Sequence, residues 1–344
     1  MTELTDYPDF FTEPEFIPWN GRLFISGIKL IARRGETAGL LPAVQAFYSQ
    51  QIESWRGLRE AVAGLKRMNV RRVKLDGRRL LLQHNPARLK NITVTLEPGK
   101  LAGRPCPICP QTMPAGQQAL PFDKNWLVVC NPLPIFPSHF VLIYRRHEPQ
   151  AADDVLSAML RFTRLTGYVT LYNGPRCGAS IPDHLHLQAS PPGCLPLERQ
   201  LPPVEDSFSG VVADSRLPRR IFLFGRDDSH AEKLFARTTF ALGRLQRKTD
   251  VLEPALNLAV VSRGRDRTPL VAVHPRARHR PECFFYEGER RFMISPGAAD
   301  TAGLVILPRK EDFDRLDGRR LRSIFSEVML DEERFAQAVR IITS

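Results

Sequence analysis

Polar and apolar residues alternate strictly along the pentapeptide His184-Leu185-His186-Leu187-Gln188. On a β-strand, this alternation directs the two histidines and the glutamine to one face of a sheet and the two leucines to the other. Two imidazoles about 7 Å apart along a strand can divide the chemistry of a site, because one can be held by a metal while the other acts as a base or nucleophile. The pattern predicts a strand with one reactive face. A strand that simply carries two polar histidines is the alternative.

A turn rich in small residues precedes this strand and contains Asn173, Gly174, Gly178 and Ser180. Glycine has no side chain, so the backbone N–H groups of such a turn can approach a phosphate closely. The turn is therefore a candidate phosphate-binding segment, placed directly before the reactive face.

The hydrophobic pattern elsewhere predicts a mixture of helices and strands. Apolar residues recur at helical spacing from Leu41 to about Lys66, which predicts one amphipathic helix. The segment from Val70 to Leu82 alternates around Asp76-Gly77, the signature of a β-hairpin with a tight turn. Further helices are predicted at 152–166 and 230–247, and further strands at 140–144, 168–172, 256–261, 270–273 and 303–307.

A proline-rich segment at 191–203 is the best linker candidate in the chain. It predicts a domain of residues 1–190 and a second region of residues 204–344. In that region a strand at 270–273, a basic loop at 274–280, a small-residue turn and a strand at 303–307 follow one another. This order echoes the first half without a second His-x-His, and it indicates a degenerate duplicate or a substrate-binding region.

The composition restricts the classes of function. The 344 residues are 43% apolar and 25% charged, as in soluble globular proteins. No window approaches the ~18 consecutive apolar residues of a membrane span, and the N-terminus is acidic, so we expect a cytoplasmic protein with no membrane partner. The net charge of +12 implies an anionic partner. Its arginine pairs are scattered and form neither a tail nor an aromatic-interleaved RNA platform, so nucleic acid is not the expected partner.

Two further motifs carry candidate chemistry. The six cysteines include Cys106-x-x-Cys109 in a turn-rich segment, which is half of a zinc site or a redox pair. A metal is favoured because no thioredoxin-like strand and helix flank it; two more ligands are then needed, and His139 and His147 flank the strand 140–144. Arg88 follows the hairpin on a loop and is either a phosphate or ribose contact or an exposed surface arginine.

Taken together, these motifs resemble the histidine-triad (HIT) superfamily. They are most similar to its transferase branch, which includes galactose-1-phosphate uridylyltransferase, diadenosine tetraphosphate phosphorylase and the GDP-hexose phosphorylases. The resemblance implies an α+β fold, namely a HIT-like antiparallel half-barrel with flanking helices, followed by a second, degenerate HIT-like unit. The segments that carry the likeness are 106–109, 137–147 and 173–188, and those at 85–88, 296–300 and 308–313 resemble a bacterial subgroup of the branch.

The resemblance also implies a role for each matching residue. His186 matches the nucleophile that attacks the α-phosphorus and becomes a nucleotidyl-histidine. Gln188 matches the residue that hydrogen-bonds the phosphoryl oxygen, where a third histidine would mark the hydrolases. The remaining matches are Cys106, Cys109, His147 and His184 as ligands of a structural Zn²⁺; Ser180, Asn173, Gly174 and Gly178 in the turn that holds ribose and phosphate; His139 behind the site; and Asn85 and Arg88 as substrate contacts.

Three hypotheses follow for the function. The leading one is a nucleotidyltransferase or phosphorylase that acts on a nucleoside diphosphate sugar or a dinucleoside polyphosphate, with phosphate or a sugar phosphate as the acceptor. The second is a non-catalytic nucleotide or nucleic-acid binding protein that uses the basic surface. The third is a HIT-type nucleotide hydrolase, against which Gln188 argues. A homodimer is compatible with all three.

Overall fold

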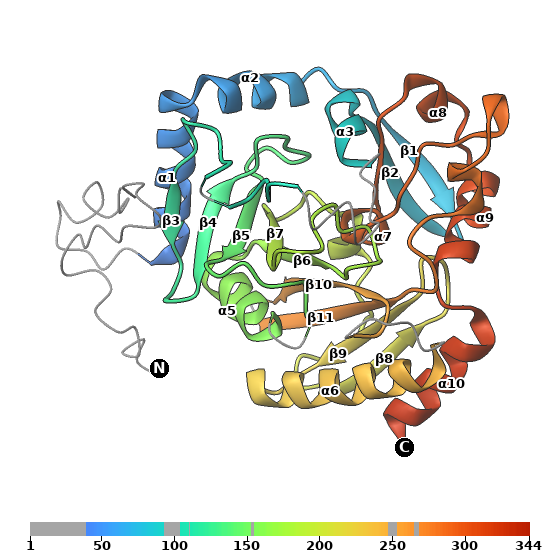
Figure 1. The fold of residues 1–344 in the computed structure, drawn as a ribbon. Helices are drawn as coiled ribbons and strands as arrows, with labels where there is room; N and C mark the ends of the chain where they lie inside the picture. The colour runs from blue at the N-terminus through green and yellow to red at the C-terminus, as the bar shows by residue number, and fades with distance from the viewer. Residues whose placement is uncertain (1–38, 93–103, 110, 153–154, 247–252, 265–267) are drawn as a thin grey trace.

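The computed structural model describes residues 39–92, 104–109, 111–152, 155–246, 253–264 and 268–344 (Figure 1). The helices are α1 (Leu40–Ser54), α2 (Arg56–Leu65), α3 (Leu89–Ile92), α5 (Leu156–Thr166), α6 (Asp228–Leu245), α7 (Ala298–Thr301), α8 (Lys310–Arg315), α9 (Gly318–Val328) and α10 (Glu332–Thr343). Short 3-10 helices lie at Pro86–Arg88, Pro196–Arg199, Glu282–Phe284 and Gly288–Arg290. None of the helices in the described segments has the length and apolar character needed to cross a lipid bilayer.

The strands are β1 (Val70–Leu75), β2 (Arg78–His84), β3 (Ala119–Pro121), β4 (Trp126–Cys130), β5 (Phe140–Tyr144), β6 (Val169–Asn173), β7 (His186–Ser190), β8 (Gly210–Asp214), β9 (Arg220–Phe224), β10 (Leu256–Arg263), β11 (Thr268–Pro275) and β12 (Leu304–Leu307). Among the described residues, nine of them form one antiparallel sheet in the order β3-β4-β5-β7-β6-β10-β11-β9-β8.

The large sheet contains the same unit twice. In the first unit β4, β5, α5, β6 and β7 follow in sequence and the strands lie in the order β4-β5-β7-β6. In the second unit β8, β9, α6, β10 and β11 follow in sequence and the strands lie in the order β8-β9-β11-β10. The units join through β6 and β10, so the sheet runs without a break past the proline-rich segment (Figure 1). The α+β half-barrel with flanking helices and a second, degenerate unit is therefore as predicted, whereas the division into domains stays a prediction.

The duplicate is built from other strands than the sequence suggested. The predicted strand 303–307 is present as β12, but β12 pairs in parallel with β2 in a separate sheet of order β1-β2-β12. The prediction that the strand at 303–307 belongs to the duplicated unit was therefore wrong. The second unit contains β8 and β9 instead. The hydrophobic pattern of the sequence did not predict these two short strands.

The two faces of the large sheet are covered differently. One face packs on α1, α5, α6 and α10, which bury a continuous apolar core against the leucines and valines of the strands. The opposite face meets a smaller apolar cluster from α7, β12 and the 3-10 helix at Pro196–Arg199. His186 and Gln188 of the alternating strand lie on this second face.

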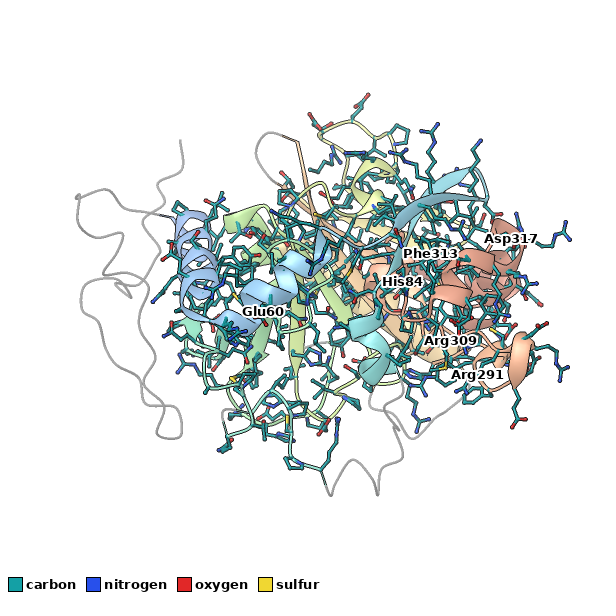
Figure 2. The ribbon with its side chains drawn as sticks, turned by 90° about the horizontal axis from the view of Figure 1, so that it is seen from above. Glu60, His84, Arg291, Arg309, Phe313 and Asp317 are labelled. Atoms are coloured by element: carbon teal, nitrogen blue, oxygen red, sulfur yellow. The ribbon has the colours of Figure 1, made fainter. Side chains whose placement is uncertain are left out.

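The predicted hairpin is confirmed and carries the small sheet. Asp76 and Gly77 have φ angles of +48° and +77°, the left-handed conformation that a tight Asp-Gly turn requires. At the other end of β2, the centroids of the His84 ring and of the Phe313 ring in α8 lie 5.9 Å apart. Both residues are labelled in Figure 2. This contact anchors the end of the hairpin, from which the chain continues to Arg88.

The single helix predicted from Leu41 to Lys66 is instead two helices. The chain becomes extended at Trp55, with φ −113° and ψ 98°, and this residue separates α1 from α2. The Trp55 indole is 9% exposed and lies so close to Gly116 that a Cβ there would be 2.6 Å from it. Burial of the indole against a glycine therefore interrupts a segment whose helical periodicity is continuous.

Candidate functional site

The alternation at 184–188 has the predicted consequence. Leu185 and Leu187 lie in the main core, and His186 and Gln188 lie on the opposite face of β7. His184 lies just before the strand, where Leu185 makes backbone hydrogen bonds to Tyr144 and Glu148 on the neighbouring chain segment. One face of the strand is therefore fixed by the core, which leaves the polar face free to form a site.

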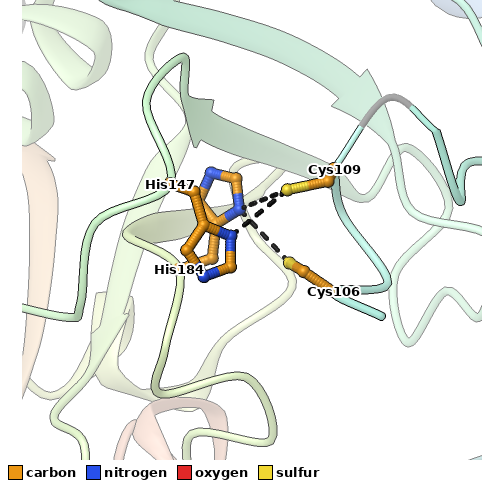
Figure 3. Close-up of side chains that lie close together, drawn as sticks. All are labelled: Cys106, Cys109, His147 and His184. Carbon is orange, nitrogen blue, oxygen red and sulfur yellow. Dashed lines mark hydrogen bonds between the residues drawn. The ribbon is translucent and has the colours of Figure 1, made fainter. Parts of the chain in front are cut away.

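The four predicted metal ligands converge in the structure. Figure 3 shows Cys106 and Cys109 on one side and His147 and His184 on the other. The His184 Nδ1 atom lies 3.3 Å from the Cys106 sulfur and 3.4 Å from the Cys109 sulfur, and the His147 Nδ1 atom lies 3.2 Å from the Cys109 sulfur. All four donor atoms lie within 4.8 Å of one another.

This donor set fits a tetrahedral zinc ion. Sulfur and nitrogen ligands at ordinary Zn–S and Zn–N bond lengths stand about 3.6 Å apart, close to the observed distances. The His184 Nε2 atom lies 2.8 Å from the Tyr144 carbonyl oxygen, so that nitrogen donates its proton and Nδ1 is left with the lone pair that a metal needs. The His147 Nε2 atom lies 4.0 Å from the Asp183 carboxylate, which is beyond hydrogen-bond distance. The residues can hold a metal ion, and its identity as zinc is part of the proposal below.

The ring of His186 is held in one orientation. Its Nδ1 atom lies 2.8 Å from the carbonyl oxygen of His184, so Nδ1 carries the proton and Nε2 has the free lone pair. The residue is 7% exposed, and burial lowers its pKa to about 4, with the His184 carbonyl opposing the shift. The imidazole is therefore neutral near pH 7, with an available nucleophilic nitrogen.

Gln188 is oriented by the histidine behind it. The Nδ1 atom of His139 accepts a hydrogen bond from the Ile135 backbone N–H at 3.2 Å, which places the ring proton on Nε2. This Nε2–H donates to the Gln188 Oε1 atom at 3.0 Å. The carboxamide oxygen of Gln188 is thereby occupied, so its N–H groups are the part left to contact an acceptor. Burial, followed by the charge of Arg88, lowers the pKa of His139 to about 3, so this ring is neutral as well.

A pocket opens in front of His186 and Gln188. Of the residues predicted from sequence, Asn173, Gly178, Ser180 and Arg88 also line it. Its opposite wall comes from the second half of the chain, through His279, Arg280, Ser295, Gly297, Ala298, Ala299 and Asp300. The site is therefore built by both halves.

The wall charges favour an anion. Arg88 and Arg280 place two guanidinium groups in the lining. Burial lowers the pKa of Arg88 to about 10, so it stays positive at neutral pH. Burial raises the pKa of Asp300, the carboxyl group in the same lining, to about 6, and its oxygens accept hydrogen bonds from the backbone N–H groups of Gly297 and Ile306. Two guanidinium groups and one carboxyl group in the lining make the pocket suited to a phosphate group.

Glycine is required where the two halves touch. Gly178 has φ +93°, and a Cβ at this position would lie 2.6 Å from the Cα of Gly297. The Gly178 N–H donates to the Nδ1 atom of His279 at 3.2 Å. The small-residue turn is thus clamped between β6 and the second half of the chain.

A buried network that the sequence reasoning missed holds this wall. Asn173 accepts hydrogen bonds at Oδ1 from Asn257 Nδ2 at 3.2 Å and from the Ala298 N–H at 2.7 Å. Arg276, which is fully buried, donates to Asn257 and to the carbonyl oxygen of Pro296. The basic run at 274–280 was visible in the sequence, but nothing in it distinguished the buried Arg276 from its exposed neighbours.

Two predicted substrate contacts lie elsewhere. Asn85 is fully buried, and its Nδ2 atom donates to Gln83 and to the Pro134 carbonyl oxygen, each at 3.3 Å. Gly174 lies against the Leu256 carbonyl oxygen, with space for no side chain. Neither residue is in the pocket lining. Their roles as substrate contacts stay predictions.

Comparisons with known proteins agree with this architecture. Residues 47–191 match a family model described as a domain of unknown function (DUF4922), and residues 210–344 match the model "GDPGP1-like, C-terminal domain". No curated protein matches the sequence.

Among solved structures, yeast Ap4A phosphorylase Apa2 has a similar fold. Its crystal structure matches at a TM-score of 0.53 and 15% identity, over 80% of this chain and 97% of that one. The complex with Ap4A matches at a TM-score of 0.51 and 16% identity, over 83% and 97% of the two chains. The complex with AMP matches at 0.50 and 16%, over 83% and 96%. The fold expected from the resemblance is thereby confirmed.

Proposed function

Because the chain has the fold of a phosphorylase from the transferase branch of the histidine-triad superfamily, we propose that it is a nucleotidyltransferase or phosphorylase that works through a covalent nucleotidyl intermediate on His186. The donor is a dinucleoside polyphosphate or a nucleoside diphosphate sugar, and the acceptor is phosphate or a sugar phosphate. The solved neighbours in complex with AMP and Ap4A support a nucleotide as the ligand.

The single observation that carries the proposal is the state of His186. Its Nδ1–H is held by the His184 carbonyl oxygen, and its Nε2 lone pair belongs to a neutral ring in the lining of an arginine-containing pocket. A binding protein has no need for an activated imidazole beside its phosphate site. A nucleophile for phosphorus requires this arrangement.

The reaction balances in two displacements. The Nε2 lone pair attacks the α-phosphorus, the bond from phosphorus to the bridging oxygen breaks, and the leaving nucleoside polyphosphate or sugar phosphate takes that electron pair. An oxygen of the acceptor then attacks the same phosphorus, the N–P bond breaks, and its electrons return to Nε2. The Nδ1 proton stays in place throughout, and the His184 carbonyl oxygen stabilises the positive charge on the ring of the intermediate.

Other residues stabilise the phosphoryl oxygens. The carboxamide oxygen of Gln188 already accepts a hydrogen bond from His139, so Gln188 offers its N–H groups to the phosphoryl oxygens. Arg88 adds a positive charge from the 3-10 helix after β2. Ser180 and the backbone of the small-residue turn complete the proposed oxyanion contacts. These donors are pre-oriented, so little reorganisation is needed in the transition state.

Zinc bound by Cys106, Cys109, His147 and His184 would act structurally. When bound, it would hold the two cysteines of the knuckle against the segment that leads into β7. His184 would then be fixed by the ion while its carbonyl oxygen continues to orient His186. The two histidines thus keep separate tasks.

A labelling experiment tests the proposal. The purified protein is incubated with diadenosine tetraphosphate and, in parallel, with ADP-, GDP- and UDP-sugars, quenched at alkaline pH, and analysed by intact-mass and peptide mass spectrometry. We expect one nucleotidyl group per chain, acid-labile and located on His186, which is discharged by phosphate or a sugar phosphate. His186→Asn should take up no label, and His230→Asn on α6 serves as the matched control because His230 lies outside the site.

The outcomes separate the hypotheses. Discharge of the label by water alone would indicate a hydrolase. If no donor labels the folded wild-type protein, the covalent mechanism is wrong. Steeply salt-dependent binding of nucleic acid that is unchanged in His186→Asn would favour the non-catalytic alternative.

A further inference from the structure

The strands that flank the pocket separate at the position of His186. β6 and β7 pair from Val169 with Ser190 to Leu171 with Gln188. If the register continued, Asn173 would face His186, but the recorded pairing ends at Leu171. The two residues at which the pairing has ended, Asn173 and His186, both line the pocket. Divergence leaves backbone groups of both strands in need of partners.

The side chain of Gln150 fills this gap. Its Oε1 atom accepts a hydrogen bond from the backbone N–H of His186 at 3.0 Å. Its Nε2 atom donates to the backbone carbonyl oxygens of His186 and Asn173, each at 3.2 Å. One carboxamide therefore replaces the peptide group that a continuous ladder would have supplied, and it binds both the N–H and the C=O of the nucleophile residue.

Gln150 is itself held firmly. It is 1% exposed, and its backbone N–H donates to the Pro182 carbonyl oxygen at 3.0 Å. Two residues earlier, the Glu148 carbonyl oxygen accepts from the Leu185 N–H at 2.6 Å. The segment 148–150 therefore runs alongside the approach to β7, and the carboxamide reaches His186 from a fixed backbone.

We propose that Gln150 is a positioning residue for the nucleophile: its carboxamide fixes the backbone of His186 where the sheet opens, and so sets the direction from which Nε2 meets the phosphorus. The consequence for catalysis rests on the proposed function, and the contact itself does not. A shift of the nucleophile by about 1 Å costs on the order of 100-fold in rate. Loss of the carboxamide should therefore slow the chemical step and leave donor binding, which uses other groups, nearly unchanged.

The test compares Gln150→Met with Gln51→Met. Methionine has a similar volume but cannot make these hydrogen bonds. Gln51 in α1 is the matched control: it is also fully buried and bonds through its carboxamide to Gln118 and Ser54, but it lies outside the pocket lining. Both variants should lose similar stability in urea unfolding. Any difference between them at the site then reflects position and not stability.

Two readouts are measured on each protein. The first is single-turnover labelling by saturating diadenosine tetraphosphate, with the dissociation constant of this donor determined separately. We expect the labelling rate of Gln150→Met to fall at least 30-fold with a change in dissociation constant below 3-fold, and that of Gln51→Met to stay within 3-fold of the wild type. The second is hydrogen exchange at the His186 amide, which should speed up at least 10-fold in Gln150→Met only.

The exchange readout requires no substrate. If the wild type is not labelled, the proposed function fails for this donor, while faster exchange at His186 still supports the positioning contact. Unchanged exchange at His186 in folded Gln150→Met overturns the proposal. So does a labelling rate within 3-fold of the wild type, or an equal loss of rate in Gln51→Met.

Discussion

Replacement of Arg276 by methionine tests how the second half of the chain builds the pocket wall. Arg276 lies just after β11 and is fully buried. Its guanidinium donates to five oxygens: the Asn257 side chain and the backbone carbonyls of Val328, Pro296, Arg278 and His279. Asn257 lies in β10 and Val328 at the end of α9. The other oxygens come from the loop that follows β11 and from the segment just before α7, and both of these also contribute residues to the pocket lining. One side chain therefore joins four segments of the second half.

The expected magnitude follows from these contacts. Each buried acceptor left without a donor costs about 1 kcal/mol or more. The Val328 carbonyl oxygen keeps the Ala277 N–H as a donor, so four oxygens lose their donor, at a cost of about 4 kcal/mol. Removal of the buried charge itself returns part of this cost, since desolvation lowers the pKa of Arg276 and marks its burial as unfavourable. We therefore expect Arg276→Met to lower the free energy of unfolding by about 2–4 kcal/mol.

Urea unfolding followed by tryptophan fluorescence at pH 7.5 measures the loss. Arg244→Met is the control, because Arg244 lies exposed on α6 over the ring of Phe240 and should cost less than about 0.5 kcal/mol. A loss below about 1 kcal/mol for Arg276→Met would refute the reasoning, since the acceptors of Arg276 would then have found other partners without cost.

Two further predictions concern protons and metal. The pKa of buried His139 is about 3, against 6.5 for the unfolded chain, so the unfolded state binds more protons between these values and stability falls as the pH drops below 6.5. This residue alone accounts for about 2 kcal/mol lost at pH 5; the opposite shift of Asp300, whose pKa is raised to about 6, returns about 1.4 kcal/mol. Urea midpoints at pH 7.5 and 5 should therefore differ less in His139→Gln than in the wild type, and equal differences would contradict the assignment. For the metal, elemental analysis should find one zinc per chain in the wild type and in Cys194→Ser, and none in Cys106→Ser; retention of zinc in Cys106→Ser would exclude the four-residue centre.

Local patterns in the sequence predicted part of the candidate site in the first half. The alternation at 184–188 predicted which residues face the core, because a strand has a period of two and its leucines must be buried. The CxxC motif indicated half of a metal site, and the resemblance to the histidine-triad superfamily implied the two histidines that lie beside it in the structure. The prediction of a single helix at 41–66 was wrong because the break at Trp55 depends on Gly116, a residue that is distant in the sequence.

The parts of the site that depend on long-range geometry were not visible in the sequence. Gln150 is 36 residues from His186, and its role arises from the separation of β6 and β7. Arg276 is buried, whereas Arg278 in the same basic run is exposed, and the local sequence does not distinguish these two arginines.

The sequence by itself predicted the alternating strand, because its residue types recur at short, regular spacing, and its resemblance to a known family implied the metal ligands and the class of fold. Only the tertiary structure decided that the second unit joins the first through β6 and β10 and closes the pocket with its own loops. The physical reason is that a buried polar group takes whichever partner the packing brings to it, and that choice depends on how strands from both halves of the chain meet.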